Sequence, residues 1–275
     1  MTKIDKITNW LADFAINKGF NGYVIGLSGG VDSAVSASLA VRALGKDKVL
    51  GILLPCAIPG ERDRTEDVEL AKKLADNLGI NYVIVRLDTP AEHLFLNIKL
   101  VTNVESHLVL SNIKARLRMT AIRAYAEANH CLVLGTTNKT EEYLGYYTKA
   151  GDGGAGVDVE PIADLFKYEV FQMARELGNI PEEIITRAPS AGLFDNQTDE
   201  SEIGITYSEI DRYLEFREGL TKHFGVERYK NHGENMKYRA KNQAKIHFDD
   251  NVIDEIEKRI VANDHKRNNP PTIEL

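Results

Sequence analysis

Short apolar runs alternate with segments of helical spacing from the start of the chain to about residue 180. The apolar runs lie at 22–27, 48–55, 81–87 and 131–136. The segments of helical spacing lie at 32–44, 61–79 and 111–129. Nearly continuous apolar strands that alternate with helices predict a parallel sheet with helices on both of its faces. We therefore expect an α/β fold, and a chain of 275 residues is short enough to form one domain over residues 1–275.

The two ends of the chain add further helical segments. Near the N-terminus, one face of an expected helix carries the apolar residues Ile4, Ile7, Leu11, Phe14 and Ala15. Residues 187–209 are instead rich in turn formers and acids and contain few apolar anchors. Because long irregular loops in compact domains commonly serve a site, we expect this segment to be a mobile lid or a spacer. Helices are expected again at about 207–224 and 252–264, before a C-terminal tail at 265–275.

Composition limits the partners and the compartment. A formal net charge of −7 argues against nonspecific nucleic-acid binding, and 43% hydrophobic residues suffice for a buried core. No apolar run approaches the roughly 18 residues that a membrane span needs, and residues 1–20 lack the pattern of a signal peptide. Cys56 and Cys131 lie in apolar runs without metal-ligand spacing. We therefore expect two core thiols and the reducing cytoplasm.

The polar stretch "GLSGGVDSA", residues 26–34, separates the first apolar run from the first helical segment. A turn of this kind forms an anion site, because its backbone N–H groups and the helix N-terminus attract negative charge. Gly29 and Gly30 permit the backbone angles and the close approach that a phosphate needs. Ser28 and Ser33 add hydroxyl donors. The stretch therefore predicts a phosphate-binding loop.

This loop differs from the commonest nucleotide-binding motifs. It contains no lysine, which excludes GxxxxGK[ST], and its glycines do not have the spacing of GxGxxG. Its S-G-G-x-D-S pattern instead resembles the pyrophosphate-binding loop of the N-type ATP pyrophosphatases, which split ATP between the α and β phosphates. In that family the aspartate binds Mg²⁺, so backbone N–H groups and a metal take the place of the lysine.

Further motifs narrow the resemblance to one family. They are "SNIKARLRM" (111–119), "LVLGTTNKTEEYLGYYTKAGDGGAG" (132–156), "EPIADLFKYEV" (160–170), "APSAGL" (188–193), "DESEIGITYSEID" (199–211) and "HKRNNPP" (265–271). In this order they are similar to the motifs of ammonia-dependent NAD synthetases. The resemblance implies a Rossmann-like domain of the adenine nucleotide alpha hydrolase type, with C-terminal helical segments.

The resemblance also implies a reaction and its partners. The carboxylate of nicotinic acid adenine dinucleotide (deamido-NAD) attacks the α-phosphate of ATP, pyrophosphate leaves, and ammonia displaces AMP to form NAD. Metal and N–H donors offset the repulsion between the carboxylate and the polyphosphate. Members of the family bind the second substrate across the interface of a two-fold homodimer, and closed dimers are the commonest oligomers. Neither nucleic acid nor a membrane is an expected partner.

The resemblance assigns roles to individual residues. The ATP-binding set is Gly26, Leu27, Ser28, Gly29, Gly30, Val31, Asp32, Ser33, Thr136, Lys167 and Ser190. The Mg²⁺ ligands are Asp32 and Glu141, and the catalytic residues are Asp32 and Lys167. The deamido-NAD set is Arg116, Lys149, Asp158, His265 and Lys266, with Asp152 as a further candidate. Because Arg116 and Arg123 are seven residues apart on a helix, they share a face from which Arg118 points away.

Without the resemblance, several of these residues have simpler interpretations. Glu141 would be a first-turn acid that stabilises a helix dipole. Lys167 would be a solvated surface charge, and Arg116 would lie on an exposed helix face. The segment 154–161 is longer than in some relatives, which leaves the register of Asp158 open.

Three alternative functions stay open at this point. Another ATP pyrophosphatase, such as a GMP synthetase or a tRNA-modifying enzyme, would share the loop but not the other motifs. A nucleotide-binding sensor on the same scaffold would lack the metal carboxylates or the lid. Glutamine could serve through a separate amidase partner, but free ammonia is the expected donor, since 275 residues do not leave room for an amidase domain.

Overall fold

The computed structural model describes residues 1–57, 65–103, 106–190, 198–223 and 244–267. Within these residues four parallel strands form one sheet in the order β3-β2-β1-β4. The strands are β1 (Tyr23–Gly26), β2 (Val49–Leu53), β3 (Asn81–Ile84) and β4 (Leu132–Val133). Each strand lies inside one of the four apolar runs, so the predicted parallel sheet is confirmed.

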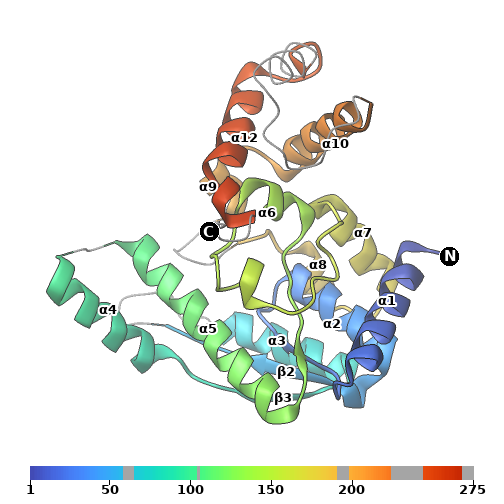
Figure 1. Ribbon diagram of the computed structural model, residues 1–275, viewed down its shortest axis with the longest axis vertical. Coiled ribbons are helices and arrows are strands. Elements are labelled where there is room, and N and C mark those ends of the chain that lie inside the picture. Colours follow the sequence, from blue (N-terminus) through green and yellow to red (C-terminus); the bar gives the residue numbers. More distant parts are fainter. Residues whose placement is uncertain (58–64, 104–105, 191–197, 224–243, 268–275) are drawn as a thin grey trace, which may run out of the picture.

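Helices cover both faces of the sheet, as the alternation predicts (Figure 1). One face is packed by α1 (Lys3–Lys18), α2 (Val31–Leu44), α3 (Thr65–Leu78), α7 (Lys167–Leu177) and α8 (Glu182–Thr186). The other face is packed by α5 (His107–Asn129). Tyr23 and Ile25 belong to the first layer, whereas Val24 belongs to the second. Since successive strand residues point to opposite faces, burial on both sides explains why the strands read as continuous apolar runs.

The helix α1 confirms the expected N-terminal amphipathic helix. Thr2 caps it by accepting a hydrogen bond from Asp5 N at 3.1 Å, and Gly19 ends it in the left-handed conformation. Leu11 and Ala15 are buried, and the other predicted apolar residues, Ile4, Ile7 and Phe14, belong to or pack against the same core.

The helix α4 (Asp88–Thr102) was not predicted from the sequence. It lies alongside α5 (Figure 1), and Ala91 is its one fully buried residue. Leu100 and Val101 are exposed, so the apolar residues of α4 do not form one buried stripe. Periodicity identifies a helix only where such a stripe exists.

A second apolar cluster lies beyond the sheet, in the upper part of Figure 1. It is formed by α6 (Lys139–Leu144), α9 (Asp199–Ile203), α10 (Tyr207–His223) and α12 (Asp250–Ala262), and α13 (Asp264–Arg267) follows. The helices α10 and α12 confirm the segments expected at 207–224 and 252–264. The helices α6, α8 and α9 span six, five and five residues, which is too short for periodicity to reveal them.

The end of the expected lid is folded. Ile203, Ile205 and Tyr207 are buried, the two isoleucines in this second cluster, so the few apolar anchors expected in the segment 187–209 fall in its last third. Residues 191–197 lie outside the described residues, and a mobile lid stays a prediction.

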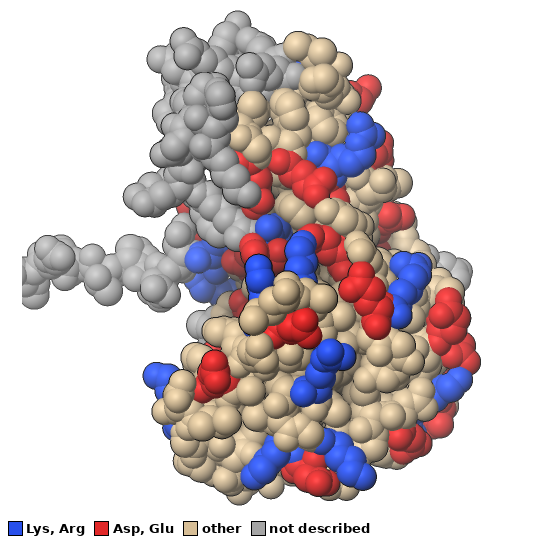
Figure 2. All heavy atoms as spheres, turned by 90° about the vertical axis from the view of Figure 1, so that its right-hand side faces the viewer, with Lys and Arg blue, Asp and Glu red and all other residues tan. Residues whose placement is uncertain are grey.

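Three surface and core features agree with the composition. Cys56 and Cys131 are buried free thiols, as predicted. Within the described ranges no helix has both the length and the apolar character that a membrane crossing requires. On the described part of the face shown in Figure 2, Lys and Arg side chains are interspersed with Asp and Glu side chains, so this face carries no large basic patch.

The strand order sets the position of the site. The chain runs outward from β1 to β2 and β3 and then returns to pair β4 with the other side of β1. The order therefore changes direction between β1 and β4. In open parallel sheets, ligands bind at the carboxyl ends of the strands next to such a switch point. The loop after β1 is the predicted phosphate-binding loop.

Candidate active site

A cavity of about 800 Å³ opens at the switch point. Its lining comes from the loop after β1, the end of β2, residues 134–137 after β4, the helix α5 and residues 187–190 and 198–199. Small-molecule sites commonly fall in the range of about 300–1,000 Å³. The cavity is therefore large enough for a nucleotide.

The phosphate-binding loop is held in shape by its own serines. Ser28 Oγ and Ser33 Oγ lie 3.1 Å apart, Gly30 N donates to Ser28 Oγ at 3.2 Å, and Ser33 Oγ donates to Gly30 O at 3.0 Å. Gly29 has a φ of +78°, and a Cβ there would lie 2.6 Å from Asp67 O. Gly30 precedes α2 without a capping side chain. The first-turn N–H groups of α2 are thus available to an anion.

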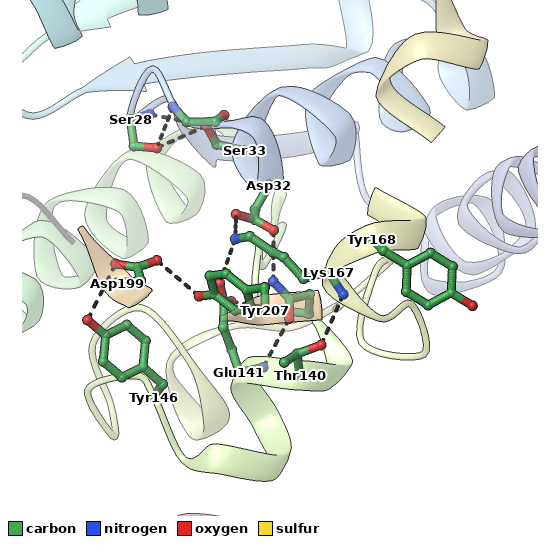
Figure 3. Close-up of polar contacts among 12 residues, drawn as sticks. Ser28, Asp32, Ser33, Thr140, Glu141, Tyr146, Lys167, Tyr168, Asp199 and Tyr207 are labelled. Carbon is green, nitrogen blue, oxygen red and sulfur yellow. Dashed lines mark hydrogen bonds and ion pairs between the residues drawn. The ribbon is translucent and has the colours of Figure 1, made fainter. Parts of the chain in front are cut away.

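Four side chains from separate elements meet beside this loop (Figure 3). Lys167 Nζ, on the first residue of α7, lies 2.6 Å from Asp32 Oδ2 and 3.0 Å from Glu141 Oε1. Asn138 Nδ2 donates to the other oxygen of Asp32 at 2.9 Å. We call Asp32, Asn138, Glu141 and Lys167 the charge cluster. It joins α2, the loop after β4, α6 and α7.

The local sequence explains the position of Glu141. Asn138 is the N-cap of α6, and its side chain accepts from Glu141 N at 3.0 Å. In return, Glu141 Oε2 accepts from Asn138 N at 3.3 Å. This reciprocal capping box fixes the carboxylate at the helix start. Glu141 is therefore a first-turn helix acid and also a member of the charge cluster.

Burial makes the charge cluster electrostatically strong. The Lys167 side chain is only 2% exposed. Burial by itself would lower the pKa of Lys167, but the carboxylates of Asp32 and Glu141 raise it above its ordinary value, so the ammonium group stays charged. Burial raises the pKa of Glu141, while Lys167 opposes the rise. The cluster carries more negative than positive charge when all three groups are ionised.

The donor set of the charge cluster fits a magnesium ion that also binds phosphates. Asp32 and Glu141 both line the cavity. Mg²⁺ is usually held by one or two carboxylates together with substrate phosphates and water. Among the residues that the structure describes, no group of three or more His, Cys, Asp or Glu side chains could hold a metal. Phosphate oxygens would therefore have to complete the coordination.

The cavity unites nearly all of the predicted ATP-binding set. The members that line it are Gly26, Leu27, Ser28, Gly30, Val31, Asp32, Ser33, Thr136, Lys167 and Ser190. Gly29 is the exception, because it turns toward Asp67. Lys167 is not the solvated surface charge that its residue type alone would suggest.

The five main residues of the predicted deamido-NAD set lie outside this cavity, whereas Asp152, the further candidate, lines it. Lys149 Nζ donates to His265 O at 2.7 Å, and Lys266 Nζ donates to Tyr147 O at 2.9 Å. The tail after α12 is thus held against the segment after α6. Arg116 is an exposed residue of α5. Lys149, His265 and Lys266 thus lie along the same two segments, and none of them lines the ATP cavity.

Asp158 is held by the protein itself. Both of its oxygens accept from Arg123 Nη1 at 2.8 Å, and Oδ2 also accepts from Val133 N at 2.8 Å. The carboxylate therefore ties the segment after Gly156 to α5 and β4. Its predicted contact with deamido-NAD stays a prediction.

Arg118 points away from the face of Arg116 and Arg123, as expected, and it is Arg118 that lines the cavity. The helix α5 faces the cavity with Ala115, Arg118, Met119 and Ile122. These residues have the i, i+3, i+4, i+7 spacing of one helix face. Arg116 is not part of that face.

Several residues in or beside the cavity were not among the predicted site residues. Tyr207 lies with its ring centroid 5.1 Å from Lys167 Nζ. Tyr207 Oη donates to Asp199 Oδ2 at 3.0 Å, and Tyr146 Oη is 3.4 Å from Asp199 Oδ1 (Figure 3). The N-x-x-E spacing of residues 138–141 would have revealed Asn138 as a cap. Asp199 and Tyr207 have no comparable local signal.

Fold and site define a class: an α/β protein with an ATP-sized cavity, a lysine-free phosphate loop and paired carboxylates at a switch point. A family model described as NAD synthase matches residues 3–270. The chain belongs to the NAD synthase family. The predicted family is therefore confirmed, and the other ATP pyrophosphatases that share the loop motif are set aside.

Individual relatives agree with this family. The chain is 47% identical over 218 residues to the NH(3)-dependent NAD(+) synthetase of Carboxydothermus hydrogenoformans, covering 79% of this chain and 86% of that protein. The structure of NMN synthetase from Francisella tularensis matches with a TM-score of 0.80 and 32% identity, over 99% of this chain and 98% of that one. The structure of NH3-dependent NAD synthetase from Campylobacter jejuni matches with a TM-score of 0.74 and 26% identity, over the same shares of the two chains.

Proposed function

We propose that this chain is a ligase that amidates deamido-NAD with ammonia in an ATP-dependent reaction, giving NAD, AMP and pyrophosphate. The observation that carries the proposal is the charge cluster beside a lysine-free phosphate loop in a member of the NAD synthase family. The names of the curated relatives support ammonia as the nitrogen donor and NAD as the product.

ATP binds with its phosphates at the loop after β1. The first-turn N–H groups of α2 donate hydrogen bonds to the β and γ phosphates, and the hydroxyls of Ser28 and Ser33 add donors. Lys167 is the mobile charge of the site, since its four-carbon chain can move the ammonium group from a carboxylate to a phosphate oxygen. Thr136 and Ser190 line the same cavity from opposite segments.

Asp32 and Glu141 would hold Mg²⁺ together with the phosphates. When bound, the metal neutralises phosphate charge and so favours departure of pyrophosphate. The lysine that phosphate loops of the GxxxxGK[ST] type carry is absent from this loop, and Lys167 supplies a cation from α7 instead.

The chemistry requires positioning rather than an enzymic nucleophile. The acceptor carboxylate attacks the α-phosphorus, pyrophosphate leaves, and the adenylated carboxyl group is then attacked by ammonia, which releases AMP. Neutral ammonia, formed when ammonium loses a proton, is a good nucleophile by itself. The two cysteines, Cys56 and Cys131, are buried, and as free thiols they suit a reducing compartment such as the cytoplasm.

The acceptor binds along the predicted deamido-NAD set, and its nicotinate carboxylate reaches into the ATP cavity, which Asp152 lines. Arg116, Lys149, Lys266 and His265 supply local positive charge to an anionic dinucleotide, although the whole chain is acidic. Arginine can pair with a phosphate through two parallel hydrogen bonds. Lys149 and His265 already lie in contact.

A homodimer is part of the proposal. On α4 the side chains of Leu100 and Val101 are 79% and 82% exposed, and Leu108 on the first turn of α5 is 63% exposed. Exposed apolar patches of this kind commonly mark protein interfaces. Leu100→Glu combined with Val101→Glu should shift the sedimentation profile toward the monomer, and an unchanged profile would exclude this surface as the interface.

The Francisella tularensis structure supports a second candidate acceptor. It carries the name NMN synthetase and matches this chain with a higher TM-score, 0.80, than the Campylobacter jejuni NAD synthetase, 0.74. Formation of NMN would use the same activation of a nicotinate carboxylate. The acceptor would then be nicotinic acid mononucleotide, which lacks the adenylate half of deamido-NAD.

Product analysis tests both candidates. The purified chain is incubated with ATP, Mg²⁺, ammonium chloride and either deamido-NAD or nicotinic acid mononucleotide, and the products are separated by chromatography. A parallel set replaces ammonium by glutamine. NAD, AMP and pyrophosphate in equal amounts with ammonium support the proposal. ADP in place of AMP would overturn it, and faster turnover of the mononucleotide would select the second candidate.

A further inference from the structure

The first turn of α7, which carries Lys167, is capped by other elements of the fold. The residue before the helix is Phe166, whose side chain has no oxygen to cap it. Lys167 N instead donates to Thr140 Oγ1 at 3.0 Å, and Tyr168 N donates to Asp211 Oδ2 at 2.9 Å. Thr140 Oγ1 in turn donates to Asp211 Oδ1 at 2.5 Å. The contact between Thr140 and the backbone of Lys167 is visible in Figure 3.

We propose that Asp211 and Thr140 are positioning residues of the reaction: they fix the first turn of α7 and so place Lys167 between Asp32 and Glu141. Neither residue belongs to the cavity lining, so they act through Lys167. This inference rests on the proposed function, because it assumes that Lys167 serves ATP.

Burial gives the clamp its rigidity. Thr140 is 0% exposed and Asp211 is 2% exposed. A buried polar group without a partner costs about 1–3 kcal/mol, so each of these bonds resists being broken. The negative charge of Asp211 also lies at the positive end of the α7 dipole, which stabilises it there. Burial raises the pKa of Asp211 to about 6, so the carboxylate is charged above neutral pH.

The clamp links the backbone positions of two members of the charge cluster, Glu141 and Lys167. Thr140 precedes Glu141 in α6, and the same hydroxyl receives the backbone N–H of Lys167. Thr140 Oγ1 therefore ties the start of α7, which carries Lys167, to α6, which carries Glu141. Asp211 adds α10, which also contributes Tyr207 beneath the Lys167 ammonium at 5.1 Å. Through α10, the second apolar cluster is thus connected to Lys167 and the phosphate-binding loop.

Two variants of Thr140 test the proposal. Thr140→Val keeps the shape but loses the hydroxyl, which leaves Lys167 N and one oxygen of Asp211 without this partner. Thr140→Ser keeps the hydroxyl. We expect Thr140→Val to lower kcat/KM for ATP about tenfold or more, since misplacement of a catalytic group by a fraction of an ångström is costly. Thr140→Ser should stay close to the wild type, and KM for ammonia should change in neither.

Asp211→Asn provides a second test that does not depend on Thr140. Its amide keeps the volume of the carboxylate but cannot accept both bonds. The matched control is Glu215→Gln on the same helix, which touches α7 only through the exposed Tyr168 hydroxyl, at 2.5 Å. We expect weaker ATP use for Asp211→Asn and no change for Glu215→Gln, both measured at pH 8.

A double-variant cycle decides whether the effect passes through Lys167. Binding of ATP with Mg²⁺ is measured by calorimetry without acceptor, for Thr140→Val, Lys167→Met and the combination. If Thr140 acts through Lys167, the second change adds no further loss of affinity. Additive losses, or equal affinities for Thr140→Val and Thr140→Ser, would overturn the inference. The binding measurement does not depend on product formation. A wild type that binds ATP but forms no NAD would therefore refute the proposed function, while the binding data would still test the clamp.

Discussion

Replacing Lys167 by methionine should destabilise the protein in a pH-dependent manner. The substitution keeps most of the volume of the side chain but removes the ammonium group that lies 2.6 Å from Asp32 and 3.0 Å from Glu141. Two carboxylates with 19% and 15% of their side chains exposed are then left facing each other. Removing one partner of a buried ion pair costs about 3–5 kcal/mol, and we expect a loss of this size at pH 8.

The sign of the pH dependence follows from Glu141. Burial raises its pKa and Lys167 opposes the rise, so the pKa of Glu141 rises further in the variant. A carboxyl group with a raised folded-state pKa contributes its full stability below its unfolded pKa, about 4.3 for glutamate. It loses that stability as the pH rises toward the folded-state pKa. Beside Lys167 the pKa of Glu141 is already about 8, so the deficit of the variant should stay nearly constant from pH 5 to pH 8. It should grow as the pH rises above about 8, by up to about 1.4 kcal/mol per pH unit for one proton.

Urea unfolding without ATP or metal, at several pH values, measures this effect. Adding Glu141→Gln to Lys167→Met should restore part of the stability above pH 8, because it removes the carboxyl group that the folded variant must keep protonated. Lys73→Met is the control, since Lys73 is 50% exposed and pairs with Glu183 at the surface, where an ion pair contributes about 0–1 kcal/mol. A loss for Lys167→Met that is as small as the control and independent of pH would refute the reasoning.

Three further substitutions probe the loop and its surroundings. Asp32→Asn should abolish NAD formation while the circular dichroism spectrum and the unfolding midpoint stay near the wild type, and near-normal product formation would contradict the metal role. Gly29→Ala should destabilise more than Gly19→Ala, because both have positive φ but only the former would place a Cβ 2.6 Å from Asp67 O; equal midpoints in thermal unfolding would show that the close approach is not felt. Asp158→Ala should lower the free energy of unfolding by about 1–3 kcal/mol, because Arg123 and Val133 N lose their acceptor. A higher KM for deamido-NAD with unchanged stability would instead favour a role in binding alone.

The parts of the fold that depend on local pattern could be predicted from the sequence. The inner strands β1, β2 and β4 are largely buried on both faces, so they appear as apolar runs, and α1, α2 and α5 each have an apolar face. The phosphate-binding loop is a continuous stretch, and its glycines and serines interact with one another. Local sequence is sufficient to specify such features.

The contacts between distant segments could not be predicted in this way. Lys167 and Asp32 are 135 residues apart, and their contact depends on how α7 packs against α2. The orientation of α5 likewise decides that Arg118, not Arg116, lines the cavity. The resemblance to a family supplied Lys167 and Glu141 as site residues, but it did not supply the clamp of Thr140 and Asp211.

Transfer of ¹⁸O from the acceptor to AMP tests the central claim most directly. Deamido-NAD labelled with ¹⁸O in its nicotinate carboxylate is converted with ATP, Mg²⁺ and ammonium, and the products are examined by mass spectrometry. If the carboxylate attacks the α-phosphorus of ATP bound at the loop after β1, AMP carries one ¹⁸O atom and the amide of NAD keeps the other. Unlabelled AMP would contradict adenylation of the carboxylate and with it the mechanism proposed for this site.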